Sequence, residues 1–340
     1  MKILLGLSGG LDSSYAAKLL TEGHEVEGAV LLMHGSTDIA AAERSAEEAG
    51  IKLHVLDRRE IFRREVEEYF ISEYRKGRTP NPCTMCNPKV KIGELCRFAA
   101  DNGFDQISTG HYARVDREDG RYCIAMGADP RKDQSYMLWG LTQEQLKMLR
   151  FPLADLTKDT VRDGARELGL ASAEARESQD ICFIPDGDYA AFLESRTAPM
   201  PEGNFVDANG KVLGKHKGIL NYTVGQRRGL GVATGQRMFV SEIRPETNEI
   251  LLLPTGAEEK TEMTVSNLNF QLLPPPESDG KEYDLECKIR YAAPPVPVKV
   301  RFEGDEAKVS FTAPVRAVTP GQSAVFYRDK KIAFGGIIRK

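Results

Sequence analysis

The chain has 340 residues, of which 41% are hydrophobic and 28% are charged, and its formal net charge is −4. These values describe a folded globular protein, and the length predicts two or three domains because a single core rarely grows so large. The mild acidity excludes a protein that coats nucleic acid along its whole surface, although a local basic patch could still bind it.

The cysteine count and the N-terminal segment bear on the compartment. Six cysteines in so long a chain do not form the dense disulfide framework of a small secreted domain. The start, MKILLGLSGG, resembles a buried strand more than a signal peptide, and no segment reaches the length of a membrane span. We therefore expect a cytoplasmic protein that works away from the membrane.

Strand-like and helical patterns alternate through the first part of the chain. Short apolar runs predict strands at residues 2–7, 26–33, 52–56 and 105–109. Amphipathic patterns predict helices at 13–20, 40–49, 58–74 and 94–102. This alternation predicts an α/β fold with a parallel sheet and helices on both faces.

The pattern changes at the Pro/Gly-rich stretch 198–204, APMPEGN. Beyond it, short alternating segments predict two small β-rich units, the second of them barrel-like. The expected domains are residues 1–200 for the catalytic unit, 203–260 for a central β-rich unit and 261–340 for the C-terminal β-rich unit.

A glycine-rich segment, GLSGGLDSS, connects the first predicted strand to the first predicted helix. Its glycines let the backbone approach a phosphate, and the amides of Ser13 and Ser14 belong to a helix N-terminus, whose dipole favours an anion. Asp12 would repel bare phosphate and is suited to Mg²⁺ that bridges the phosphates. The spacing matches neither GxxxxGK[ST] nor GxGxxG, so the two commonest nucleotide loops are excluded.

This segment resembles the SGGxDS pyrophosphate loop (PP-loop) of ATP pyrophosphatases. The resemblance implies cleavage of ATP between its α and β phosphates, which leaves an adenylated substrate and pyrophosphate. The loop residues expected to bind ATP are Gly6, Leu7, Ser8, Gly9, Gly10, Leu11, Asp12 and Ser13.

Three cysteines are candidates for the chemistry that follows adenylation. Cys83 and Cys86 lie in the proline-marked stretch TPNPCTMCN, and Cys182 lies in ESQDICFIP. An adenylated carbon needs a nucleophile, and a thiolate is strongly nucleophilic near neutral pH. From the residues alone, a metal site, a redox pair and a sulfur-handling site all remain open.

Motifs spread along nearly the whole chain resemble those of the bacterial tRNA-specific 2-thiouridylases. They are SGGLDSS, TGHYAR, KDQSY, ESQDICFIP, YTVGQRRGLG, KIRY and TPGQSAVFY, in family order. The resemblance implies 2-thiolation of the wobble uridine, position 34, in tRNAs for Lys, Glu and Gln. It also implies the use of ATP and Mg²⁺, adenylation of the uridine O2, and sulfur from a donor protein or a sulfide source.

The same resemblance assigns individual residues. Cys182 would carry a persulfide, and Cys86 would attack it to release sulfur or to form a disulfide. Gly110 and Leu31 would contact the adenosine. The expected tRNA contacts are Asn81, Pro82, Cys83, His111, Lys132, Asp133, Gln134, Arg290, Tyr291 and Gln322.

The chain departs from the family pattern at two places. Many members have Asp where this chain has Cys83, so three thiols are available. They could hold a [4Fe–4S] cluster whose open iron binds sulfide, or they could leave the persulfide route intact with Cys83 as a spare thiol. They could also bind zinc, or the CxxC thiols could be an inert pair. The segment between Met33 and Asp57 is also shorter than usual, which puts its contacts in question.

The remaining cysteines, one histidine and several basic residues have simpler interpretations. Cys96, Cys123 and Cys287 have the pattern of buried small apolar residues. His216 fits either a solvated basic turn or a tRNA contact, and nearby basic residues could bind phosphates: Lys215, Lys217, Arg227 and Arg228. The alternative functions are another PP-loop ligase or amidotransferase, and a non-catalytic tRNA-binding protein.

Overall fold

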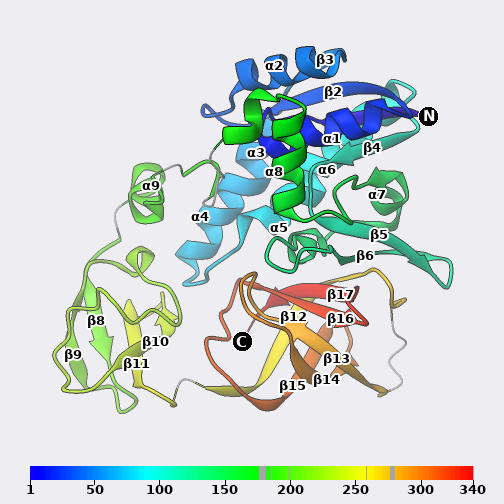
Figure 1. The fold of residues 1–340 in the computed structure, drawn as a ribbon. Coiled ribbons are helices and arrows are strands. Elements are labelled where there is room, and N and C mark those ends of the chain that lie inside the picture. Colours follow the sequence, from blue (N-terminus) through cyan, green and yellow to red (C-terminus); the bar gives the residue numbers. More distant parts are fainter. Residues whose placement is uncertain (176–180, 185, 199, 258, 276–279, 340) are drawn as a thin grey trace.

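The computed structural model describes residues 1–340 except 176–180, 185, 199, 258, 276–279 and 340. The described residues form an α/β unit, a small β-rich unit and a β-barrel, and the barrel lies beneath the α/β unit in Figure 1. No helix among these residues has both the length and the apolar character needed to cross a membrane.

The α/β unit is built on a five-stranded parallel sheet with the order β3-β2-β1-β4-β7. Its strands are β1 (Lys2–Gly6), β2 (Glu25–Leu32), β3 (Leu53–Asp57), β4 (Gln106–Thr109) and β7 (Leu149–Arg150). The two faces are both covered, because Ile3 and Leu5 pack against one set of helices and Leu4 against another. The predicted fold class is confirmed.

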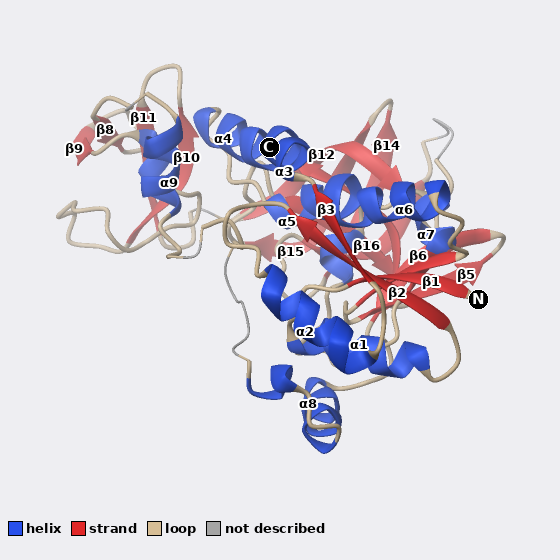
Figure 2. Ribbon diagram, turned by 90° about the horizontal axis from the view of Figure 1, so that it is seen from above, coloured by secondary structure: helices blue, strands red, loops and turns tan. Residues whose placement is uncertain are grey.

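Helices flank this sheet on both sides (Figure 2). On one face lie α1 (Leu11–Thr21), α2 (Ile39–Ala49) and α8 (Lys158–Glu167), and on the other lies α6 (Ile92–Asp101). Shorter helices are η3 (Ser135–Leu138), α7 (Gln143–Met148), η4 (Ala171–Glu174) and α9 (Tyr189–Arg196).

Two long helical stretches each contain a π-helical turn. The helix predicted at 58–74 is α3 (Arg59–Phe62), η1 (Arg63–Glu67) and α4 (Glu68–Arg75) in succession. The one predicted at 94–102 starts much earlier, with α5 (Pro82–Cys86) and η2 (Asn87–Lys91) before α6. Prolines inside the TPNPCTMCNP stretch suggested a loop, but Pro82 occupies the first helical turn, where its missing N–H costs nothing.

The central unit has a four-stranded sheet with the order β10-β11-β8-β9 and a core of its own. Its elements are β8 (Gly203–Val206), β9 (Val212–His216), η5 (Ile219–Asn221), β10 (Met238–Arg244) and β11 (Glu249–Pro254). Figure 1 shows it beside the barrel, joined to the α/β unit through α9.

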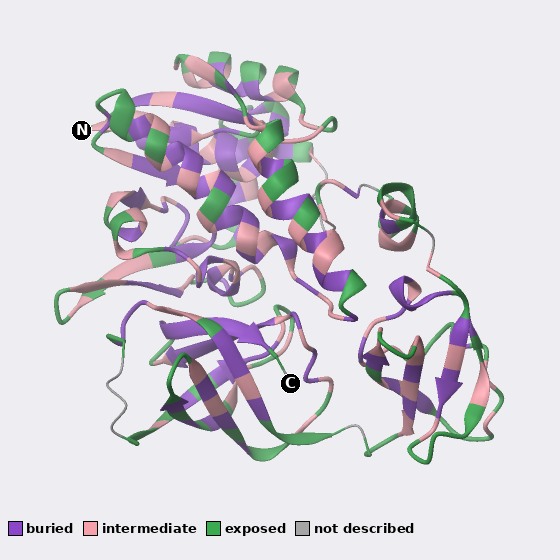
Figure 3. Cartoon of the chain, turned by 180° about the vertical axis from the view of Figure 1, so that it is seen from behind, coloured by how far each residue is buried: buried purple, intermediate pink, exposed green. Residues whose placement is uncertain are grey.

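The C-terminal unit is a closed barrel, because β12 pairs with both β15 and β17. Its strands are β12 (Lys260–Phe270), β13 (Glu282–Lys288), β14 (Val296–Glu303), β15 (Glu306–Val315), β16 (Ser323–Arg328) and β17 (Lys331–Ile338). Buried and exposed residues alternate along β14, as expected for a strand with one face inside a barrel. Figure 3 shows buried and exposed positions mixed along the strands of the barrel.

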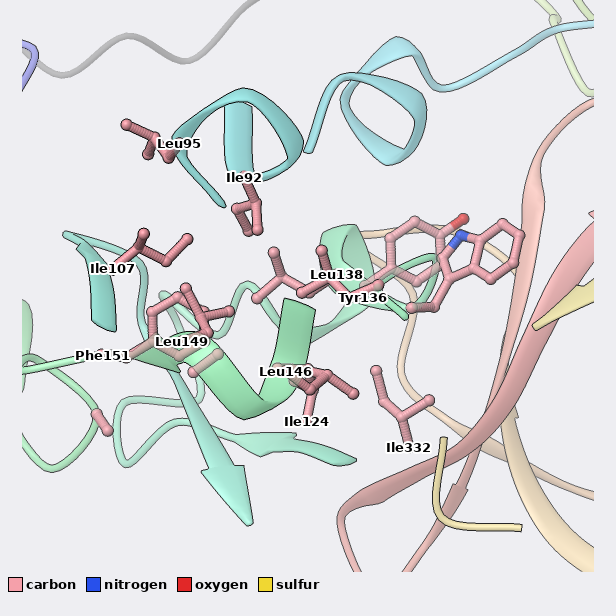
Figure 4. Packing of buried hydrophobic residues seen from close by; sticks show 14 of the residues in the cluster. Ile92, Leu95, Ile107, Ile124, Tyr136, Leu138, Leu146, Leu149, Phe151 and Ile332 are labelled. Atoms are coloured by element: carbon pink, nitrogen blue, oxygen red, sulfur yellow. The ribbon is translucent and has the colours of Figure 1, made fainter. Parts of the chain in front are cut away.

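The barrel and the α/β unit share one core. The hairpin of β5 (Ala113–Glu118) and β6 (Arg121–Met126) extends the barrel sheet through pairing of Ala125 with Lys331. One hydrophobic cluster runs from Ile92 and Leu95 of α6 to Ile332 of β17 (Figure 4). The sequence suggested separate units and not this continuity.

Candidate active site

The phosphate loop connects β1 to α1 at the carboxyl end of the sheet. Ser13 Oγ donates a hydrogen bond to the carbonyl of Gly10 (3.0 Å) and accepts one from the Ser8 amide (3.2 Å), which folds the loop tightly. In the described part of the chain no side chain caps α1, so the amides of its first turn are available to an anion.

Gly9 is required by the geometry of this loop. Its φ is +78°, and a Cβ there would lie 2.4 Å from the carbonyl carbon of Ala41 at the start of α2. Only glycine permits this approach, because a side chain would be both strained and in collision with backbone. The loop is therefore held between α1 and α2.

Asp12 is part of a charged cluster beside the loop. Its Oδ1 accepts hydrogen bonds from Tyr112 Oη (2.8 Å) and from Lys158 Nζ (2.6 Å). Lys158 is largely buried at the start of α8, where Thr157 caps the helix and Asp129 accepts the Lys158 amide. A cation next to a phosphate loop can stabilise the charge that develops on pyrophosphate as it leaves.

The sequence alone does not identify Lys158 as a candidate site residue. The only local signal is Thr157, a residue type that often caps a helix, directly before Lys158. Nothing in the spacing connects Lys158 with Asp12, 146 residues away.

The end of β4 packs against this cluster. A Cβ on Gly110 would lie 2.9 Å from the backbone of Asp12 and Ser13, so glycine allows the close contact. His111 Nδ1 shares a hydrogen bond with Thr109 Oγ1 (2.7 Å), and burial lowers the pKa of His111 to about 3, so its ring is neutral. Leu31, the other expected adenosine contact, has its side chain in the core.

Cys83 and Cys86 lie on the short helix α5. Asn81 caps this helix by accepting the Cys83 amide on its side-chain oxygen (3.1 Å). Cys83 is partly exposed, whereas Cys86 is buried. Burial raises the pKa of Cys86 to about 12 and also raises that of Cys83, while the charge of Lys91 opposes both shifts.

Cys182 is exposed and lies near the other two thiols. Its carbonyl accepts a hydrogen bond from Ser36 Oγ (3.3 Å). The next residue, Phe183, packs edge-on against Phe62 with ring centroids 5.5 Å apart, and Phe62 belongs to the same buried cluster as Cys86. The Cys182 thiol adds to the rise in the pKa of Cys86. The structure thus brings the three thiols into one neighbourhood.

Lys91 connects the thiols with the nucleotide side of the site. Its positive charge opposes the burial-driven rise in the pKa of Cys182, as it does for the other two thiols, and contributes to the lowered pKa of His111. His111 follows Gly110, which touches the phosphate loop. Met33, which directly follows β2 at the carboxyl end of the sheet, packs against the same buried cluster as Cys86. The thiols therefore lie at the edge of the sheet where the loop lies.

The fit to a metal centre is poor. Three thiols are the right chemistry for a [4Fe–4S] cluster. However, the described residues contain no group of three His, Cys, Asp or Glu side chains placed to hold a metal ion.

The expected tRNA contacts lie in different surroundings. Some have their side chains bonded inside the protein: Asp133 accepts from Gly127 N and Ser135, Gln134 from Tyr112 N, and Gln322 donates to Thr79 O. Tyr291 is partly exposed and lies close to Tyr136, with its pKa raised mainly by burial and further by Asp133 and Cys83. The barrel thus reaches the neighbourhood of the thiols. Pro82 is buried on α5, and Lys132 is half-buried in the turn that follows β6.

His216 and the three other cysteines differ in how far they are buried. His216 is neither a solvated residue nor an RNA contact: it is buried, it accepts the Gly218 amide on Nδ1, and its Nε2 bonds to the carbonyl of Asn248. Cys123 and Cys287 are fully buried as expected, while Cys96 is only partly buried. The basic side chains around His216 and the Gly225–Gly231 loop are exposed: Lys215, Lys217, Arg227 and Arg228.

Three family models match consecutive parts of the chain. The model described as "tRNA methyl transferase HUP domain" matches residues 1–186, "tRNA methyl transferase PRC-barrel domain" matches 190–253, and "Aminomethyltransferase beta-barrel domain" matches 260–338. Together with the loop, the sheet and the thiols, these matches define a PP-loop enzyme of tRNA modification that carries two β-rich domains.

Full-length relatives make the assignment more specific. The tRNA-specific 2-thiouridylase MnmA of Carboxydothermus hydrogenoformans is 44% identical over 359 residues, covering 100% of this chain and 98% of that protein. Those of Clostridium botulinum strain Eklund 17B and Clostridioides difficile are 43% and 40% identical, covering 99% and 100% of this chain and 97% and 98% of theirs. The chain belongs to the tRNA-specific 2-thiouridylase family.

Proposed function

We propose that this enzyme thiolates C2 of the wobble uridine of tRNA in an ATP-dependent reaction, with the transferred sulfur carried as a persulfide on Cys182. The observation that supports this most directly is the placement of Cys83, Cys86 and Cys182 in one neighbourhood, at the sheet edge that carries the phosphate loop. The substrates would be tRNAs for Lys, Glu and Gln, and the enzyme would work in the cytoplasm.

The first step is adenylation. The phosphate loop and the first-turn amides of α1 bind the phosphates of ATP, and Lys158 stabilises the departing pyrophosphate. Mg²⁺, which the family uses with ATP, would neutralise phosphate charge, with Asp12 beside it. The uridine O2 attacks the α-phosphorus, pyrophosphate leaves, and C2 becomes electrophilic.

The second step is sulfur transfer. A donor protein that carries a cysteine persulfide loads Cys182, which is the most accessible of the three thiols. The Cys182 thiolate attacks the outer sulfur of the donor persulfide, and the donor cysteine leaves as a thiol. The terminal persulfide sulfur attacks C2 and AMP leaves. The Cys86 thiolate then attacks the Cys182 sulfur, the old S–S bond breaks, and sulfur stays on C2. The resulting Cys86–Cys182 disulfide needs a thiol reductant before the next cycle.

The persulfide route is favoured over an iron–sulfur cluster. The described thiols are not arranged to hold a metal ion, and an exposed thiol paired with a buried one suits loading followed by resolution. We therefore derive no step through a cluster, and Cys83 is a spare thiol in this scheme.

The three parts of the chain would divide the work. Residues 1–200 would carry the ATP and thiol chemistry, while 203–260 and 261–340 would bind the tRNA by shape and backbone. The target base would be read after it is splayed out of the anticodon loop, because A-form major grooves hide base edges.

Cysteine variants test the proposal. With a persulfide donor, ATP and tRNA, Cys182→Ala and Cys86→Ala should abolish 2-thiouridine formation, while Cys83→Asp should retain it without iron. Cys96→Ala is the matched control, because Cys96 lies partly exposed on α6, outside this site. Iron and acid-labile sulfide in anaerobically purified protein, lost together with activity in Cys83→Asp, would contradict the persulfide route.

A ligase or amidotransferase has no need for the three thiols. Absence of 2-thiouridine from the tRNA of a deletion strain would argue against it. Pyrophosphate release that depends on tRNA with uridine at position 34 would exclude a non-catalytic tRNA-binding protein.

A further inference from the structure

The segment that carries Cys83 and Cys86 is hydrogen-bonded to a loop of the C-terminal barrel, which lies more than 200 residues further along the chain. This junction loop, residues 316–322, connects β15 to β16. The Thr79 amide donates to the carbonyl of Pro320 (2.9 Å), and Gln322 Nε2 donates to the carbonyl of Thr79 (2.7 Å). Both backbone polar groups of Thr79, four residues before Cys83, are thus bonded to the barrel.

A second contact with the barrel is made by Thr84, which lies between Cys83 and Cys86 in the sequence. Thr84 Oγ1 lies 3.4 Å from Ser323 Oγ, and both residues are buried. Ser323 is held in turn by Trp139 Nε1, which donates to its Oγ (2.8 Å), and by Tyr136 Oη, which donates to its carbonyl (2.8 Å). The helix that carries the thiols therefore rests on the first residue of β16.

The junction loop fits closely against this segment. Gly321 has φ +92°, and a Cβ there would lie 2.9 Å from Arg78 Cβ and from the Thr79 amide nitrogen. The contact is backbone against backbone, with no room for a side chain. Such a contact transmits small displacements directly, because closely packed atoms cannot deform independently.

The other side of the junction loop is held by the central unit. Arg290 Nη2 donates to Thr319 Oγ1 (2.6 Å) and to the carbonyl of Val224 (3.1 Å). A Cβ on Gly225 would lie 3.0 Å from Ala317 Cβ. All three parts of the chain therefore meet at this loop, immediately beside the Cys83–Cys86 helix.

We propose that the junction loop holds the Cys83–Cys86 helix in register for sulfur transfer, with Gln322 as the positioning residue. This inference rests on the proposed function, since it concerns the step in which Cys86 reaches Cys182. It assigns Gln322 a role within the protein, in addition to the tRNA contact that the family resemblance implies. Misplacement of a reacting group by about 1 Å can cost about a hundredfold in rate, so a lost hydrogen bond here has a measurable effect.

The experiment compares Gln322→Leu, which removes the donor to Thr79, with Lys331→Ala. Lys331 forms an ion pair with Glu118 of the β5–β6 hairpin (2.8 Å) and therefore joins the same two units away from the cysteines. Three quantities are measured on the full-length proteins with tRNA, ATP and a persulfide donor: 2-thiouridine formed per pyrophosphate released, KM for tRNA, and the iodoacetamide alkylation rates of Cys83 and Cys86 without substrates.

We expect Gln322→Leu to lower the ratio of 2-thiouridine to pyrophosphate about tenfold and to change the alkylation rates of Cys83 and Cys86. Lys331→Ala should change neither. Gln322→Lys, which keeps a donor that can reach Thr79, should recover part of the ratio. A rise in KM for tRNA with an unchanged ratio would make Gln322 an RNA contact only and would overturn the proposal, as would an effect of Lys331→Ala equal to that of Gln322→Leu.

Failure of the proposed function gives a different result. In that case the unsubstituted protein would form no 2-thiouridine, while the alkylation rates would still show whether Gln322 positions the cysteines. Unchanged alkylation in Gln322→Leu would overturn the positioning role by itself.

Discussion

Asp12 Oδ1 and Lys158 Nζ lie 2.6 Å apart, although 146 residues separate them in the chain. The pair joins the first turn of α1 to the first turn of α8, so both helices present their N-termini beside the phosphate loop. A carboxylate and a buried ammonium group thus lie together at the loop that we propose binds the phosphates of ATP.

Lys158→Met should slow tRNA-dependent pyrophosphate release about a hundredfold, because it removes a cation from the leaving group and leaves Asp12 without its ion pair. Arg166→Ala, on the exposed side of the same helix, is the control and should behave like the parent protein. Pyrophosphate release by Lys158→Met within twofold of the parent would argue against a role for Lys158 in catalysis.

Gly9→Ala should abolish ATP binding, measured by equilibrium dialysis, because the added methyl would collide with the backbone of Ala41 and strain a positive φ. Gly23→Ala is the control, since a Cβ there meets nothing within 4 Å. Normal ATP affinity in Gly9→Ala would show that the loop can move away from α2 without loss of function.

Alkylation of Cys86 should be slow at pH 7.5 and should rise about tenfold for each pH unit up to about pH 12. Burial raises the pKa of Cys86 to about 12, so the reactive thiolate is a small fraction below that pH and grows with it. Lys91→Ala should slow the reaction further, because the Lys91 charge favours the thiolate. Mass spectrometry of iodoacetamide-treated protein measures this, and a rate at pH 7.5 equal to that of a free thiol would contradict it.

The free energy of unfolding should depend on Glu27 at neutral pH but not in strong acid. Lys2 and His54 bind this carboxylate on β2 and hold its pKa at about 2, below the usual value. A depressed pKa stabilises the fold above about pH 4.5, and this stability is lost as the pH falls through about 2. Glu27→Gln should therefore cost about 1 kcal/mol in urea unfolding at pH 7. A difference that persists unchanged at pH 2.5 would count against this cause.

Gln271→Leu should destabilise the protein by about 2 kcal/mol, because several buried polar groups lose their partners at once. Gln271 is fully buried and bonds the Ile124 amide (2.9 Å) and the carbonyls of Leu138 (2.9 Å) and Trp139 (3.0 Å). Because the α/β unit and the barrel share one core, these two units should still unfold together in calorimetry of the variant. Separate transitions of the α/β unit and the barrel in the unsubstituted protein, beyond one from the central unit with its own core, would show that the two units are independent.

Much of the α/β unit could be predicted from the sequence. The apolar runs and amphipathic patterns up to residue 109 correspond to β1 through β4 and to the helices between them within a few residues, except that the last helical stretch starts much earlier than predicted. Proline misled the prediction at α5, where Pro82 begins a helix. His216 was misjudged because a basic, glycine-flanked turn resembles a surface, while its burial depends on packing against Phe205 and Tyr222.

The sequence by itself determined the phosphate loop, the three thiols and the family, since these are carried by residue types at short, fixed spacings. The tertiary structure alone decided which distant groups meet: Lys158 beside Asp12, and Gln322 of the barrel beside Thr79. Local periodicity reports which face of an element is buried, but not which element covers it. Contacts between segments more than a hundred residues apart form only when the chain folds around the shared core.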